Sequence, residues 1–155
     1  MSKSLARVTS ALAALGIETD VMEMPGETRT AQDAAREAGC AVDQIAKSII
    51  FRGEASDGVV LFITAGGNQV DAGKAGAVAG EPLGRADAAF VRERTGFAIG
   101  GVAPVGHLTP SRIFFDPRLL DFDVVYAAAG TPRHIFPVAP ALLLNATGGH
   151  EADFT

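Results

Sequence analysis

The chain has 155 residues, 48% of them apolar and 20% charged, which is the composition of an ordinary soluble protein with a sizeable core. This length predicts one domain over residues 1–155. A single cysteine, Cys40, excludes an internal disulfide and a cysteine-based zinc cluster, and it fits a reducing, cytoplasmic location. The net charge of −5 excludes a broadly basic surface for nucleic acid, but it is compatible with a small basic mouth for the end of an RNA.

The N-terminal segment predicts an amphipathic helix that ends at Gly16, because its apolar residues follow helical spacing: Leu5, Val8, Leu12 and Leu15. Its apolar stretch is too short to cross a bilayer, and so is every other one, so no membrane partner is expected. Residues 17–24 predict a strand. Thr30 is expected to cap a second helix, with Asp33 in its first turn and Gly39 at its end.

Strands and helices alternate irregularly in the rest of the chain. The apolar runs 48–51 and 59–65, separated by the polar segment 53–58, predict a β-hairpin. The remaining expected elements are helices near 71–79 and 86–95, the latter ending at Gly96, strands at 112–115, 124–128 and 133–138, and a last helix over 140–144 that ends at Gly148. Because strands come in hairpin-like clusters, the pattern favours a mixed α+β sheet or barrel over a doubly wound fold.

Common catalytic motifs fail in this chain. Gly73-Lys74 lacks both the first glycine and the Ser or Thr of a phosphate-binding loop. The three histidines are far apart in sequence, which predicts no metal site. Cys40 is expected to be a buried structural thiol. Ser48 and Lys47 should point to opposite faces of a strand, which disfavours a serine–lysine nucleophile.

Two features hold when taken together. Lys47 opens the apolar strand 48–51, and residues 99–107 form a segment rich in glycine and proline, here called the glycine loop. Taken singly, the lysine is an ordinary strand-edge residue and the loop a wide turn.

Their succession resembles the YbaK/EbsC family of aminoacyl-tRNA editing proteins, which are related to a domain inserted in some bacterial prolyl-tRNA synthetases. The resemblance covers about residues 20 to 155 and rests on these segments: Thr30-Ala31-Gln32-Asp33-Ala34-Ala35, Gly39-Cys40, residues 44–51, residues 100–107, Ala128-Ala129-Gly130, Leu142-Leu143, Thr147-Gly148-Gly149 and Ala152-Asp153-Phe154.

This resemblance implies a mixed, mostly antiparallel central sheet or barrel surrounded by helices. It also implies hydrolysis, without metal or cofactor, of the ester between a wrong amino acid and the 3′-terminal adenosine of a tRNA. The family's lysine falls on Lys47. His134 lies where some relatives that clear alanine carry a histidine, whereas Thr131-Pro132-Arg133 replaces a Gly-Lys-Arg of other relatives, which leaves the substrate open.

Ester hydrolysis passes through an oxyanion, and the backbone N–H groups of Gly100 and Gly101 are expected to stabilise it. Lys47 would hold the terminal phosphate or the ribose hydroxyls, water would attack, and the substrate's 2′-hydroxyl would relay the proton. Pro104 would stiffen the loop. The remaining expected substrate contacts are Met22, Thr30, Val102, Ala103, Gly106, His107 and His134.

The expected substrate is a tRNA carrying a small amino acid, with alanine on a proline tRNA as the leading candidate. A small apolar pocket would act as a second sieve, because one methylene alone gives a synthetase only about 1–3 kcal/mol of discrimination. Two alternatives stay open: a non-catalytic module that binds tRNA or an aminoacyl-tRNA synthetase, and a hydrolase of small esters or nucleotides.

Overall fold

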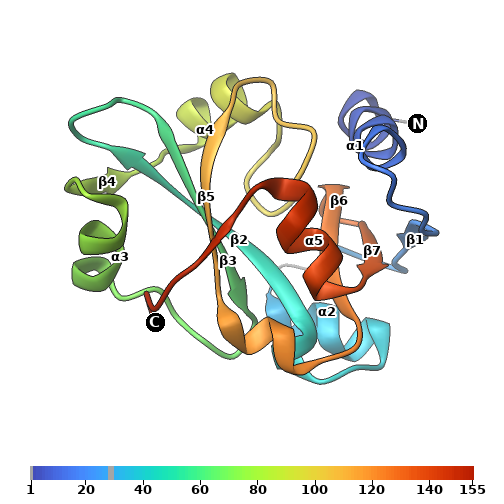
Figure 1. Ribbon diagram of the computed structural model, residues 1–155. Coiled ribbons are helices and arrows are strands. Elements are labelled where there is room, and N and C mark those ends of the chain that lie inside the picture. Colours follow the sequence, from blue (N-terminus) through green and yellow to red (C-terminus); the bar gives the residue numbers. More distant parts are fainter. Residues whose placement is uncertain (1, 28–29) are drawn as a thin grey trace.

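The computed structural model describes residues 2–27 and 30–155 as one mixed sheet with helices around it (Figure 1). In chain order the elements are α1 (Lys3–Ala14), β1 (Met22–Glu23), α2 (Ala31–Ala38), η1 (Val42–Gln44), β2 (Ile45–Gly53), β3 (Val59–Ala65), α3 (Ala72–Ala79), β4 (Leu83–Arg85), α4 (Ala88–Thr95), β5 (Ser111–Phe115), η2 (Pro117–Asp121), β6 (Val125–Thr131), β7 (His134–Val138), α5 (Pro140–Thr147) and β8 (His150–Glu151).

The sheet has the order β1-β7-β6-β2-β3-β5-β8, and β4 pairs with β2 beside this path. Hairpin neighbours pair antiparallel, whereas β2 with β6, β3 with β5 and β5 with β8 pair parallel. The strands at the two ends, β1 and β8, do not pair with each other, so the sheet is open. The expected mixed, mostly antiparallel α+β sheet is confirmed, and its alternative, a closed barrel, is wrong.

Short polar caps fix where the helices begin and end. The Thr30 hydroxyl accepts a hydrogen bond from the Asp33 N–H at 3.0 Å and so begins α2. Asp71 and Asp87 cap α3 and α4 in the same way. Four helices end at a glycine with positive φ, a conformation that costs glycine little: Gly39, Gly80, Gly96 and Gly148. The helix boundaries expected at Thr30, Gly39, Gly96 and Gly148 are confirmed.

The central strand β3 is buried along its whole length because both faces of the sheet are covered there. Leu61 and Ile63 face a large core with α1, β6 and α5. Phe62 faces a second core beneath α3, where its ring contacts those of Phe114 and Phe154 at centroid distances of 5.4 and 4.8 Å. Burying large side chains on both faces fixes the position of β3, and therefore that of its partner β2.

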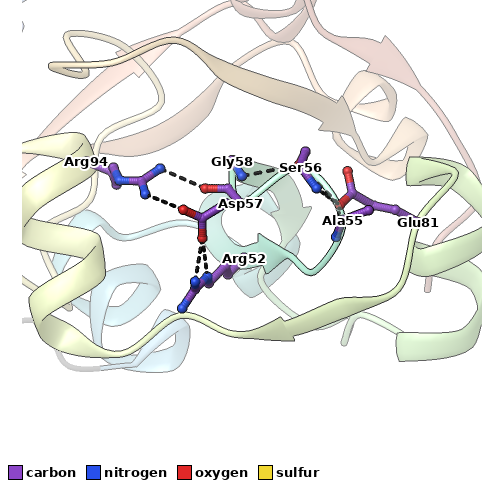
Figure 2. A network of polar contacts seen from close by, with 7 residues as sticks. All are labelled: Arg52, Ala55, Ser56, Asp57, Gly58, Glu81 and Arg94. Atoms are coloured by element: carbon purple, nitrogen blue, oxygen red, sulfur yellow. Dashed lines mark hydrogen bonds and ion pairs between the residues drawn. The ribbon is translucent and has the colours of Figure 1, made fainter.

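The turn between β2 and β3 is held by the hydrogen bonds and ion pairs of Asp57 and Glu81, here called the carboxylate clamp (Figure 2). Arg94 of α4 donates to the Asp57 carbonyl and carboxylate at 2.7 and 2.9 Å, and Arg52 binds the same carboxylate. These guanidinium contacts hold the pKa of Asp57 below its usual range. Glu81 accepts hydrogen bonds from the Ala55 and Ser56 N–H groups at 3.0 Å. The predicted hairpin is thereby confirmed.

Three strands differ from the sequence-based expectation. The strand expected over 17–24 is reduced to β1, which pairs with β7 through only Met22 and Glu23. The short strands β4 and β8 were not expected, because two or three residues carry no readable alternation. In the described part of the chain, no helix has the length and apolarity that a membrane span needs.

Candidate active site

A gap between two parallel strands creates a cleft. β2 pairs with β6 only through Ile45 with Tyr126 and Ala46 with Ala127. Beyond Ala46 the two strands diverge, and on this side of β2 no strand pairs with residues 47–50 in the described part of the chain. The edge of β2 is therefore open at the point where Lys47 lies.

The cleft has a volume of about 510 Å³, which is within the usual range for small-molecule sites. Its walls come from five parts of the chain: α2 and its cap, β2, the turn after β3, the glycine loop, and the strands β6 and β7. The lining residues are Thr30, Ala31, Gln32, Ala34, Ile45, Ala46, Lys47, Ser48, Ile49, Gly66, Gly67, Asn68, Gln69, Ile99, Gly100, Val102, Tyr126, Ala128 and Ile135. Many of these side chains are small and apolar.

Lys47 is half-buried in this cleft, and its Nζ donates to the Gly66 carbonyl at 3.3 Å. Burial lowers the pKa of Lys47, while the carboxylates of Asp116 and Asp43 oppose this shift because they stabilise the ammonium. Lys47 is thus a partly desolvated cation that faces the cleft.

Asp116 fixes the turn after β3, whose Gly66 carbonyl accepts the hydrogen bond from Lys47. It is 3% exposed, and its carboxylate accepts hydrogen bonds from the N–H of Ala65 at 3.1 Å, the amide of Asn68 at 2.9 Å and the N–H of Arg118 at 3.0 Å. A Cβ on Gly66 would overlap the Val42 carbonyl, so only glycine lets the chain pass there. Sequence reasoning missed this support, although a Gly-Gly-Asn segment directly after a buried strand is a readable signal.

The glycine loop enters the cleft through a tight turn. The Gly101 N–H donates to the Ala98 carbonyl at 3.0 Å, and Gly100 has a φ of +93°, which the third residue of such a turn requires. Gly101 was expected to donate to an oxyanion, but its N–H is used inside this turn. Gly100 and Val102 line the cleft, and within residues 2–27 and 30–155 their N–H groups have no hydrogen-bond acceptor.

The structure brings together four of the expected site residues and leaves the others outside the cleft lining. Lys47, Thr30, Gly100 and Val102 line it. The residues outside this lining are Met22, Gly101, Ala103, Pro104, Gly106, His107 and His134. Met22 pairs with Ile135 in the sheet and so lies beside this lining residue. His134 precedes Ile135 in β7, points to the opposite face of the strand, and bonds the Thr131 hydroxyl at 2.6 Å.

Pro104, Gly106 and His107 line a separate hollow between the glycine loop and α5. The His107 Nε2 donates to the Ala103 carbonyl at 2.6 Å, and its Nδ1 lies 3.0 Å from the Ser111 hydroxyl. Burial lowers the pKa of His107 and so favours the neutral ring, in which Nδ1 accepts a hydrogen bond from the Ser111 hydroxyl. His107 therefore holds the loop from behind instead of facing the cleft.

Neither a metal centre nor a serine nucleophile is assembled here. In the part of the chain that the structure describes, no three His, Cys, Asp or Glu side chains gather closely enough to hold a metal ion. The Ser48 hydroxyl is buried without a hydrogen-bond partner there, so it is not paired with Lys47. Cys40 is half-buried, and burial raises the pKa of its thiol, which keeps it protonated and unreactive.

The sheet is open, and Lys47 and the glycine loop line the cleft at the gap between β2 and β6. These features are typical of small α+β domains that bind a ligand in a cleft of the sheet. Residues 25–146 match the family of aminoacyl-tRNA editing domains, and the chain belongs to this family. It is also 33% identical to the uncharacterized protein YwhH of Bacillus subtilis (strain 168) over 123 residues, 79% of this chain and 78% of YwhH.

Solved structures agree with this assignment. A protein proposed to be a trans-editing enzyme for prolyl-tRNA synthetase has a TM-score of 0.93 and 47% identity, covering 100% of this chain and 98% of that one. The hypothetical protein APE2540 has a TM-score of 0.88 and 30% identity over 96% of this chain and 98% of its own.

The environment of Asp116 predicts a large loss of stability in the Asp116→Asn variant. The amide keeps the shape but puts a donor where the carboxylate accepts, so the free energy of unfolding should fall by about 3 kcal/mol. Urea denaturation measures this change. The control is Asp121→Asn, which removes an exposed partner of Arg118 and should cost less than about 1 kcal/mol. Equal losses in the two variants would show that Asp116 does not support the site.

The neutral His107 predicts a stability that falls in mild acid. Because its folded pKa lies below the ordinary 6.5, the unfolded chain binds the proton first, and stability is lost as the pH falls through 6.5 toward the folded value. Denaturation at pH 7.5 and 5.5 measures this loss. The His107→Gln variant should lose less between the two pH values, and an equal loss would assign the acid sensitivity to other groups.

Proposed function

We propose that this protein is a trans-editing hydrolase that deacylates mischarged aminoacyl-tRNA. The observation that carries the proposal is that Lys47, Gly100 and Val102 line one cleft, and that the N–H groups of Gly100 and Val102 have no acceptor within the described residues. Membership in the aminoacyl-tRNA editing domain family supplies the substrate class, and the structural relative proposed to act for prolyl-tRNA synthetase supports editing in trans.

The chemistry needs donors for a developing oxyanion and a group that holds the ribose or the terminal phosphate. In our proposal the N–H groups of Gly100 and Val102 are the oxyanion donors, since the N–H of Gly101 is occupied. Such a donor is commonly worth about 3 kcal/mol in the transition state. Lys47 binds the phosphate or the ribose hydroxyls as a cation, which the nearby carboxylates favour. Water attacks the ester carbonyl, and the bond from this carbon to the 3′-oxygen breaks. The substrate's 2′-hydroxyl relays the proton of the water to the departing 3′-oxygen, which releases the free amino acid and the tRNA.

The size of the cleft supports an aminoacyl-adenosine as the bound group. A volume of about 510 Å³ exceeds the needs of an amino acid alone and is suitable for an amino acid with its nucleoside. Ala31, Ala34, Ala46 and Ala128 make part of the wall small and apolar, and the rest of the lining is partly polar. We therefore propose a small amino acid as the acyl group, with alanine on a proline tRNA first and serine as its nearest competitor.

The protein's net charge limits how much of the tRNA it can contact. A net charge of −5 argues against long contact with the RNA backbone, so recognition of the 3′ end is the mode that we propose. A synthetase partner would supply the missing affinity for the rest of the tRNA.

A panel of substrates tests the proposed function. Alanyl-, seryl-, cysteinyl- and prolyl-tRNA are supplied at equal concentration, and initial rates of deacylation are compared. We expect the alanyl ester to react fastest, at least about tenfold faster than the prolyl ester, because a ring collides with walls shaped for a methyl group. Fast hydrolysis of the prolyl ester, or equal rates for all four, would contradict the small-pocket proposal. Binding without turnover would favour the non-catalytic alternative, and turnover of small esters alone would favour a general hydrolase.

Lys47→Ala tests the role of the lysine. We expect kcat/KM for the preferred ester to fall about 100-fold, with the thermal midpoint close to that of the parent, because only one long hydrogen bond to Gly66 is lost. The matched control is Lys74→Ala, an exposed lysine that pairs with Asp153 outside the cleft. Parental activity in a folded Lys47→Ala protein would remove Lys47 from the mechanism.

A further inference from the structure

The N-terminal helix α1 lies against the back of the site, outside the family match over residues 25–146. It packs beside β6 (Figure 1) and buries Leu5, Val8 and Leu12 in the large core. These apolar contacts explain why the helix docks. They do not explain two polar side chains on the same helix, which reach the backbone of two other segments.

Arg7 binds the glycine loop. Its Nε donates to the Gly106 carbonyl at 2.6 Å, and its Nη2 donates to the Thr95 carbonyl at 3.3 Å. The guanidinium also lies over the Phe97 ring, 4.7 Å from the centroid. The Arg7 guanidinium therefore contacts the chain both before and after the part of the glycine loop that enters the cleft. Charge-assisted hydrogen bonds of this kind are stronger than neutral ones.

Ser4 binds the last part of β6. Its hydroxyl donates to the Gly130 carbonyl at 2.7 Å. Gly130 has a φ of +100°, and a Cβ there would lie 2.8 Å from the Ser4 carbonyl oxygen, so this backbone approaches α1 as closely as a glycine permits. One helix thus grips both segments.

The two segments also touch each other. A Cβ on Gly101 would lie 2.9 Å from the Thr131 backbone, which places the glycine loop directly against the end of β6. Thr131 in turn bonds His134 next to the cleft wall. Gly100 and Val102, which line the cleft, flank Gly101 at this contact, and α1 bonds both segments through Arg7 and Ser4.

We propose that α1 holds the glycine loop in the conformation that lines the cleft, with Arg7 as a positioning residue. The catalytic part of this inference rests on the proposed function, because it assigns the loop's N–H groups to the oxyanion. Oxyanion donors work only when they are fixed before the reaction. Arg7 touches no substrate and acts through the Gly106 and Thr95 carbonyls.

The test compares Arg7→Met, Arg7→Lys and the control Lys3→Met in the full chain. Lys3 is an exposed cation on the same helix, and its side chain makes no hydrogen bond or ion pair within the described residues. The first measurement is hydrogen exchange of the peptide covering residues 98–106. We expect exchange about tenfold faster in Arg7→Met, a smaller rise in Arg7→Lys, which keeps one donor, and none in Lys3→Met. Peptides from β3 should exchange as in the parent.

The second measurement is steady-state deacylation. We expect kcat to fall about tenfold in Arg7→Met with KM nearly unchanged, and partial recovery in Arg7→Lys. Parental loop exchange in Arg7→Met, or faster exchange with parental kcat, would overturn the proposal. A uniform rise of exchange across β3 would also overturn it, because Arg7 would then stabilise the whole fold. If the parent deacylates no tRNA, the proposed function has failed, and the exchange measurement still decides whether Arg7 holds the loop.

Discussion

The structure depends on the short parallel pairing between β2 and β6. Two residues of each strand pair, and then the strands separate, although β3 continues to pair with β2 on its other side from Ala46 to Arg52. A strand edge without a partner must find hydrogen bonds elsewhere, in water or in a ligand. The gap at residues 47–50 therefore makes the cleft and gives it a polar backbone edge next to Lys47.

The position of β2 at this gap is held by contacts elsewhere in the structure. β3 is buried on both faces and holds β2 from one side, and the carboxylate clamp at the hairpin turn fixes its far end. Asp116 fixes the near end through the segment after β3. Because hydrogen bonds to a buried carboxylate are strong and costly to lose, this support is rigid.

Much of the fold was readable from the sequence because the signals are local. Caps such as Thr30, and glycines such as Gly39 and Gly96, mark helix ends through hydrogen bonds within one turn. The pairing of β8 with β5 was not readable, since only tertiary contact determines it. The site divides in the same way. Lys47 and Gly100 were found through the resemblance to a known family, whereas Asp116 was missed because its partners Ala65 and Asn68 lie about 50 residues earlier in the chain.

The two halves of the proposed site have separate supports. Lys47 donates to the Gly66 carbonyl, and the turn that contains Gly66 is fixed by Asp116 and Asp43. The glycine loop is held by the bond of His107 to the Ala103 carbonyl and by Arg7 from α1. No hydrogen bond links these two sets within the described residues. Effects on stability at unconnected positions usually add, whereas residues that act on one transition state do not. Coupling between the lysine and the loop should therefore arise through a bound substrate that spans both, so that the cleft becomes one site only when the ester is in place.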